Sequence, residues 1–417
     1  MSAAAPVVEQ LGTRTPWFRW EAWQHEGWGW TLWAVFALIV AVNRFSDPPL
    51  PASVFEMGRE SWRASVFQMY RDAANRWIDG QPLFNGTGGG AIYLPQAYLL
   101  FTPFTLLPFP WGGAIWRILN IGLFAVGVWQ FARLASRGTS RNLFVLVSLP
   151  VILLSWSAAR HGQMTMAMGG MMLLAVVDLA DQRWWRATLW LVLGVILKPL
   201  ALVLALLAAV LYPRTSWRLL VGAGLALTLP LLAQHPVYVV EQYVLAVKEI
   251  AIAARVGGES EFADLFWLVR AAGLDIPAAG QTAIRMVAAV LTLAICWLAV
   301  GRCRPAEAGV IVYTLAAGYL MLFNPRTENN TYCLLAPAMA VFAAQAVVAR
   351  HRFHIVFSVG LMVLFLASYS LGKALSHQPV VWIKPLLCTV FLVIVLRQLG
   401  STLRSRPRPL ENPSTAL

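Results

Sequence analysis

The sequence is dominated by a succession of apolar runs, most of them close to the roughly 20 residues that an α-helix needs to cross a bilayer. These runs are rich in Leu, Ala and Gly and lack the alternation of period two that marks the strands of a membrane barrel. In lipid, a helix satisfies its own backbone hydrogen bonds, so such runs predict helices. The apolar runs are 27–45, 112–134, 142–157, 163–180, 186–212, 217–235, 280–301, 306–323, 331–349, 354–373 and 380–399.

Composition supports the same fold class, an all-α polytopic membrane protein. Of the 417 residues, 59% are hydrophobic and 12% are charged, and the mean hydropathy of +0.64 exceeds that of soluble globular chains. The net charge of +13 could suggest a nucleic-acid partner. However, Lys and Arg occupy short loops and the C-terminal tail, where they orient spans in the membrane, so we predict membrane lipids and no nucleic acid as partners.

Cysteine usage gives no sign of a metal site or a disulfide framework. Cys296, Cys303, Cys333 and Cys388 show no paired Cys or Cys/His spacing, and most lie in or beside apolar runs. We interpret them as small packing residues and predict no cofactor or metal.

The run 186–212 is predicted to be a broken pair of helices. Basic residues flank both of its ends, which places both ends on the cytoplasmic side. Lys198-Pro199 lies in the middle, and proline ends a helix because it lacks an amide donor and clashes with the preceding turn. Two short antiparallel helices with Leu197, Lys198 and Pro199 at their apex satisfy both conditions.

The remaining basic loops complete a topology of about twelve transmembrane helices with both termini in the cytoplasm. The run 91–109 contains four prolines, which predict a short, broken, partly inserted helix. We expect a cytoplasmic N-terminal segment and a basic cytoplasmic tail around one transmembrane domain with a large first extracytoplasmic loop. The corresponding ranges are 1–26, 401–417, 27–400 and 46–111.

Polar clusters interrupt the apolar pattern, and this topology places all of them at the extracytoplasmic face. They are the loop 46–90, the turn Arg160–Gln163, the Lys198 apex and the segment 324–332. Polar groups beside hydrocarbon are costly when unpaired, so such clusters often line a cavity or meet a polar ligand. A solvated turn between helices is the alternative for each cluster taken alone.

Several blocks resemble membrane glycosyltransferases of the GT-C superfamily, specifically glycosyltransferase family 87. Tyr93–Phe104 with Leu106–Pro108, Trp116 and Asn120 is similar to the proline- and leucine-rich element of that family, with Leu94 replacing one proline. Arg160–Thr165 is similar to its Gly-Gln-x-Asn element, with Thr165 replacing Asn. Gly194–Pro199 resembles its Gly-x-x-x-Leu-Lys element. The stretch from Asn324 to Pro337 resembles its last element, with Asn330 where His is common.

The resemblance implies a GT-C-like fold and a polyprenyl-phosphate-mannose-dependent mannosyltransferase-like activity. One feature departs from the family. An aspartate four or five residues before the equivalent of Tyr70 is the presumed catalytic base, and these positions are Ser65 and Val66 in this chain. We predict Asp72 as the base, ahead of Glu60 and Glu56. Pairing of Asp72 with Arg71, Arg76 or solvent is the alternative.

Transfer from a lipid phosphate also requires cations that hold the departing phosphate. Lys198 and Arg326 are the candidates, although Lys198 could instead extend to the interface and Arg326 could instead pair with Glu328. The candidates for sugar or acceptor binding share polar or aromatic side chains at the same face. They are Tyr70, His161, Gln163, Glu328, Asn330 and Tyr332.

The sequence therefore predicts an inverting transferase in a cell membrane, such as the bacterial inner (plasma) membrane, with an extracytoplasmic active site. It would move a hexose, mannose in the family pattern, from a polyprenyl-phosphate donor to a lipid or glycan acceptor. One alternative is a protein that binds or translocates the lipid-linked sugar without catalysis. Another is a secondary transporter, although such proteins carry paired broken helices in two related halves.

Overall fold

The computed structural model describes residues 25–43, 66–84, 86, 92–137, 141–256, 262–376 and 382–405. Every regular element in these residues is a helix, which confirms the all-α fold. Seven of the described helices are long and apolar enough to cross a membrane. They are α1 (Glu26–Asn43), α4 (Phe109–Ala135), α5 (Phe144–His161), α9 (Pro213–Thr228, continued by the 3-10 turn η6, Leu229–Leu232), α12 (Ala278–Arg302), α13 (Pro305–Phe323) and α16 (Ile383–Ser405).

Five further apolar helices are shorter or have a shorter apolar part. They are α6 (Thr165–Ala180), α7 (Trp184–Leu197), α8 (Leu202–Leu211), α14 (Ala336–Val348) and α15 (Arg352–Ser376). Each predicted run coincides with one of these helices, except that 186–212 contains two. The chain is thus a polytopic membrane protein, while the count of about twelve spans stays a prediction. The predicted cytoplasmic segments at the two ends fall largely outside the described residues.

The break within the run 186–212 occurs where proline predicts it. Helix α7 ends at Leu197, Lys198 is extended with φ −152° and ψ 124°, and the 3-10 turn η5 (Pro199–Ala201) leads into α8. Proline disfavours the helical conformation of the residue before it, so Lys198 leaves the helix. Helices α7 and α8 contact each other and both pack against α9. The predicted broken pair is confirmed.

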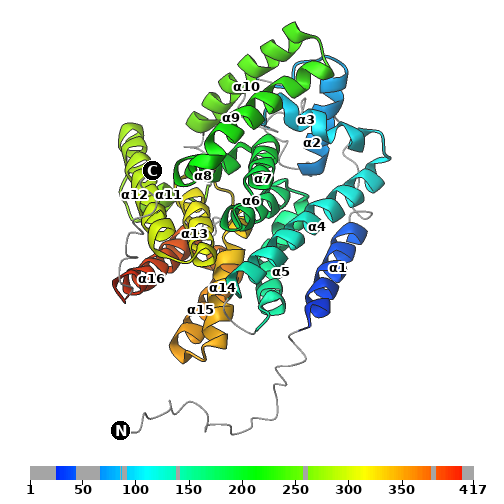
Figure 1. Ribbon diagram of the computed structural model, residues 1–417. Coiled ribbons are helices and arrows are strands. Elements are labelled where there is room, and N and C mark those ends of the chain that lie inside the picture. The colour runs from blue at the N-terminus through cyan, green and yellow to red at the C-terminus, as the bar shows by residue number, and fades with distance from the viewer. Residues whose placement is uncertain are drawn as a thin grey trace, which may run out of the picture.

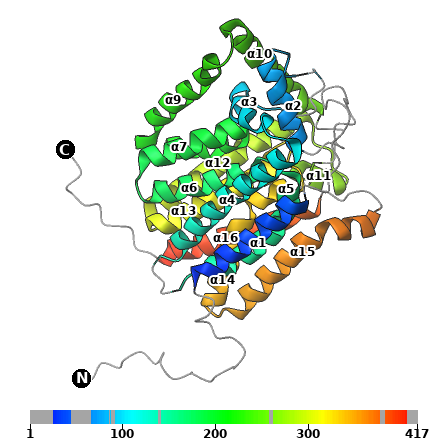
Figure 2. The same cartoon turned by 90° about the vertical axis from the view of Figure 1, so that its right-hand side faces the viewer.

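The end of the molecule beside this break carries short helices that do not form long spans. The run 91–109 contains α3 (Pro95–Phe101) and the 3-10 turn η4 (Thr102–Thr105), as its prolines predict. The amphipathic helix α2 (Val66–Ile78) packs on α3. Two elements, α10 (Pro236–Val256) and α11 (Leu265–Ala271), lie in a region for which the sequence analysis predicts no helix. Both views show α10 at the same end as α2 and α3 (Figures 1 and 2).

Helix α6 forms the centre of the bundle, and each of its residues is buried. It packs closely on α4 because glycines remove side chains from the contact. A Cβ atom added to Gly170 would lie 2.5 Å from the carbonyl oxygen of Leu123, and one added to Gly127 would lie 2.6 Å from that of Gly170. Small residues let helices in membranes approach this closely, so van der Waals packing holds α4 and α6 together.

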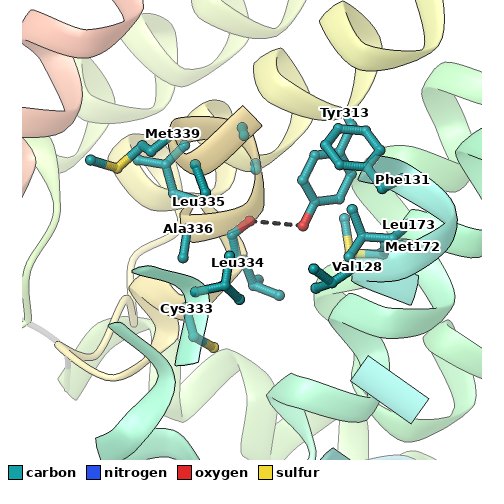
Figure 3. Close-up of a cluster of buried hydrophobic side chains, with 14 of the residues drawn as sticks. Val128, Phe131, Met172, Leu173, Tyr313, Cys333, Leu334, Leu335, Ala336 and Met339 are labelled. Carbon is teal, nitrogen blue, oxygen red and sulfur yellow. Dashed lines mark hydrogen bonds between the residues drawn. The ribbon is translucent and has the colours of Figure 1, made fainter. Parts of the chain in front are cut away.

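A buried hydrogen bond fixes the chain after the polar segment 324–330. The hydroxyl of Tyr313 on α13 donates to the carbonyl oxygen of Leu334 at 2.7 Å, within a cluster that includes Phe131 and Leu173 (Figure 3). Leu334 ends the 3-10 turn η7 (Thr331–Leu334), which continues towards α14. Cys333 is buried there, and all four cysteines are free, as expected for packing residues.

Candidate functional site

A cavity of about 480 Å³ opens beside the break between α7 and α8. Its lining includes polar side chains from four separate stretches of chain: Tyr93, Lys198, Arg285, Asn324, Arg326 and Glu328. It also includes apolar side chains, among them those of η5, α8 and α10: Leu200, Leu202, Val203, Leu206, Ile250 and Ala253. The cavity therefore combines charged groups with hydrocarbon side chains.

Two leucines of α8 that line the cavity are also exposed on the surface of the protein. The side chains of Leu202 and Leu206 remain 47% and 59% exposed although they line the cavity. They belong to an apolar helix of the membrane bundle. A ligand with a long apolar tail could therefore extend from the cavity along the exposed apolar surface of α8.

Lys198 lines the cavity at the break between α7 and α8, where the chain is extended. Its ammonium nitrogen donates to the hydroxyl oxygen of Thr165 at 2.9 Å. Thr165 is the first residue of α6 and donates in turn to the side-chain oxygen of Gln163 at 3.4 Å. The predicted Lys198 apex and the predicted Gln163 turn, separate in sequence, are thus joined through one hydroxyl group.

The segment 324–330 is held in place by Thr327, which is fully buried. Its hydroxyl donates to the carbonyl oxygens of Leu320 and Asn324 at 3.1 and 3.0 Å and so caps the end of α13. Its own carbonyl oxygen accepts from the amide of Ala263 at 2.7 Å. Arg326 and Glu328, on either side of Thr327, both line the cavity.

Arg326 lies among acidic and aromatic groups. Its guanidinium carbon lies 5.4 Å from the ring centre of Phe262. Burial lowers the pKa of Arg326, whereas Glu328, Tyr93 and Glu249 act to raise it. The charge of Glu328 therefore favours the protonated form of Arg326, in line with the alternative that the two side chains interact.

Glu328 is connected to the Gln163 turn. The side-chain nitrogen of Gln163 donates to a carboxylate oxygen of Glu328 at 2.8 Å, and Gln163 is buried. A chain of hydrogen bonds consequently links Glu328, Gln163, Thr165 and Lys198. This chain brings together predicted site residues that lie up to 165 positions apart.

Tyr70 contacts the same group of residues from α2. Its hydroxyl lies 3.2 Å from the hydroxyl of Tyr93, which lines the cavity, and accepts from the amide of Met164 at 3.3 Å. Burial raises the pKa of Tyr70 well above that of an ordinary phenol. Tyr70 therefore contacts Tyr93, which lines the cavity, and does not itself line it.

Of the candidate bases predicted from the first external loop, the structure describes Asp72, which is not among the residues that line the cavity. On α2, Asp72 is about 200° around the helix axis from the buried Tyr70, since successive residues turn by about 100°. The role of Asp72 as base stays a prediction. Val66 packs against an apolar cluster that contains Tyr70, Met164 and Leu197. Glu56, Glu60 and Ser65 lie outside the described residues.

Three other predicted binding residues also lie away from the cavity wall. His161 is exposed, and its Nδ1 lies 2.7 Å from the carbonyl oxygen of Ser157 in its own helix. Tyr332 is buried and donates to the carbonyl oxygen of Ala263 at 2.9 Å. The side-chain oxygen of Asn330 is buried and has no hydrogen-bond partner among the described residues.

The sequence analysis did not propose two charged residues that lie near the cavity. Arg285 of α12 lines the cavity and donates to the carbonyl oxygen of Phe323 at 3.0 Å. A charge inside an apolar run is itself a signal of function, and that signal was available in 280–301. Glu249 of α10 is buried and accepts from the amide of Gly86 at 3.0 Å. No motif marks Glu249, because its position depends on how α10 packs.

A comparison with known protein families identifies one that covers much of this region. Residues 91–325 match glycosyltransferase family 87, and this stretch includes Tyr93, Gln163 and Lys198. It ends immediately before Arg326 and Glu328, and it begins after α2. No curated protein matches the chain. The matched stretch covers more than half of the sequence, and the chain belongs to glycosyltransferase family 87.

Proposed function

We propose that this glycosyltransferase moves a hexose, mannose in keeping with its family resemblance, from a polyprenyl-phosphate donor to a lipid or glycan acceptor. The observation that carries the proposal is the mixed lining of the cavity. Lys198 and Arg326 line it together with exposed leucines of an apolar helix. An anionic head attached to a long hydrocarbon tail matches both kinds of side chain.

Lys198 and Arg326 are the proposed ligands of the donor phosphate. Guanidinium and ammonium groups form short, charge-assisted hydrogen bonds with phosphate oxygens, and Arg can bind two oxygens at once. Both side chains line the cavity, and Lys198 is held by the hydroxyl of Thr165. In the transition state, the bond from the anomeric carbon to the phosphate oxygen breaks, and negative charge grows on that phosphate. Fixed cations stabilise this charge.

Glu328 is the proposed general base in place of Asp72. Among the described residues that line the cavity, it is the one carboxylate. The acceptor hydroxyl oxygen would attack the anomeric carbon from the face opposite the phosphate. Glu328 would take the hydroxyl proton, the phosphate would leave with the bonding electron pair, and the product would have inverted configuration. The hydrogen bond from Gln163 holds this carboxylate at the cavity wall.

Binding without catalysis remains a second candidate because of one specific substitution. Val66 stands at one of the two positions where the family resemblance implies a catalytic aspartate. Its side chain packs among apolar side chains. A site that keeps the phosphate ligands and lacks a base would bind the lipid-linked sugar without transferring it. The proposed role of Glu328 distinguishes the two candidates.

Purified protein in nanodiscs would be incubated with radiolabelled polyprenyl-phosphate mannose and an extract of membrane lipids. Transfer of label to a product in the parent, lost in Glu328→Gln, would support the proposed enzyme. Saturable donor binding without transfer would favour the binding protein. Absence of both binding and transfer would argue against a polyprenyl-phosphate ligand.

A further inference from the structure

Side chains of α4 form hydrogen bonds with the backbone of the turn between α5 and α6. Three α4 side chains reach backbone atoms of this turn, and all three are buried. The indole nitrogen of Trp116 donates to the carbonyl oxygen of Gly162 at 2.7 Å. Arg117 donates to the carbonyl oxygen of Arg160 through two nitrogens, at 3.0 and 2.8 Å. These two residues satisfy carbonyl groups that the end of a helix leaves without partners.

Asn120 differs from its two neighbours because its amide binds on both sides of the turn. Its nitrogen donates to the carbonyl oxygen of Gln163 at 2.6 Å. Its oxygen accepts from the amide of Ala167, in the first turn of α6, also at 2.6 Å. The first amides of a helix have no partner within it, so this bond supplies a cap from another helix.

The stretch between the two backbone groups that Asn120 binds, Gln163 to Ala167, carries side chains that contact the proposed base and a proposed phosphate ligand. Gln163 donates to Glu328, and Thr165 accepts from Lys198. Both side chains lie between the two backbone groups that Asn120 binds. A rotation of this stretch would therefore move the contacts of the carboxylate and of the ammonium group together.

We infer that Asn120 is a positioning residue for the glycosyl transfer, acting through Gln163 and Thr165. This inference rests on the proposed function. Asn120 fixes the backbone from Gln163 to Ala167 so that Gln163 orients Glu328 and Thr165 orients Lys198. Trp116 and Arg117 bind the carbonyl groups of Gly162 and Arg160, which lie before Gln163 at the end of α5. They therefore do not fix the backbone from Gln163 to Ala167.

A double-mutant cycle tests this role. Asn120→Asp keeps the acceptor for the Ala167 amide and replaces the donor with a carboxylate beside the Gln163 carbonyl. We expect kcat to fall by about 10- to 100-fold, the scale of a small misplacement of catalytic groups. In a background that carries both Gln163→Leu and Thr165→Val, the same change should lower kcat by less than about threefold, because residues acting through the same contacts are not additive. Equal losses in both backgrounds would overturn the inference.

Asn142 offers a matched control at the other end of α5. Its side chain also bridges two groups, donating to Glu26 at 3.1 Å and accepting from the amide of Phe144 at 2.8 Å. Asn142→Ala should lower thermal stability and leave kcat within about twofold of the parent, since distant sites add independently. A loss of kcat in Asn142→Ala as large as in Asn120→Asp would show a general effect of stability and contradict the inference.

A structure of Asn120→Asp separates this inference from the proposed function. Loss of the contact between Gln163 and Glu328, or of that between Lys198 and Thr165, would support positioning by Asn120 even if the parent transfers no sugar. Retention of both contacts would refute positioning by Asn120 whatever the parent's activity. Failure of the parent to bind farnesyl phosphate or to turn over would instead count against the proposed donor.

Discussion

Gln163 donates a hydrogen bond to Glu328 across 2.8 Å, although 165 positions separate the two residues in sequence. This bond joins the start of the central helix α6 to the segment that follows α13. It also places a carboxylate in the wall of a cavity that Lys198 and Arg326 share. The candidate site therefore depends on two polar breaks in the helical bundle meeting at one point.

Replacing Lys198 with Met is expected to weaken the binding of farnesyl phosphate. A hydrogen bond to a charged group contributes about 1.5–3 kcal/mol, so the Kd should rise by about 10- to 150-fold. Lys248→Met serves as the control, since Lys248 is exposed on α10 and should leave the Kd unchanged. Isothermal titration in detergent measures both values. An unchanged Kd in Lys198→Met would remove Lys198 from the phosphate site.

Glu328→Gln should abolish most turnover while the donor still binds. General base catalysis contributes about 10²- to 10⁴-fold, and the amide keeps the shape of the side chain. Asp72→Asn is the comparison, because Asp72 does not line the cavity, and it should keep turnover close to that of the parent. The reverse outcome, with activity lost only in Asp72→Asn, would restore Asp72 as the base.

The contact between α4 and α6 should not tolerate a larger residue at Gly170. A Cβ atom there meets the backbone oxygen of Leu123 at 2.5 Å, so Gly170→Ala forces the helices apart. Overpacking of this kind costs about 1–3 kcal/mol, which thermal unfolding in detergent would detect as a lower Tm. Gly122→Ala on α4 is the matched control, since nothing lies within 4 Å of its added Cβ. Equal Tm values for the two variants would contradict this packing.

Asp264 should make stability depend on pH. Burial raises its pKa to about 6, although the side chain caps α11 by accepting from the amides of Phe266 and Trp267. The folded state then binds the proton more tightly than the unfolded state. Stability should therefore fall as pH rises from about 4 to about 6. Asp264→Asn, which cannot ionise, should lack this decrease, and Tm measured across this range compares the two proteins. Parallel pH profiles would count against the raised pKa.

The orientation in the membrane can be tested by cysteine labelling of intact cells. Basic loops predict that Ser136, just after α4, faces the cytoplasm and that Ser61 in the first loop faces outward. With the half-buried Cys303 replaced by Ser, an impermeant maleimide should label Ser61→Cys and not Ser136→Cys. Labelling of Ser136→Cys alone would invert the topology.

The sequence by itself determined the apolar membrane helices and their proline breaks, but not α10 and α11. Apolar runs identified the membrane helices, because hydrocarbon requires each backbone group to be satisfied within its own segment. Proline identified the break at Lys198 and the short helices of 91–109, because its effect on the helix is local. The family resemblance, carried by short motifs in a fixed order, also needed no tertiary information, and the match over 91–325 confirms it.

Only the tertiary structure decided which polar residues share the cavity. Lys198, Arg326 and Glu328 line it, while His161, Asn330 and Tyr332 do not, although all six stand in similar polar stretches. Sequence spacing places a side chain on a helix face, but it does not say which neighbouring element covers that face. The support from Asn120 and the approach of Glu249 on α10 likewise arise from packing between elements distant in the chain.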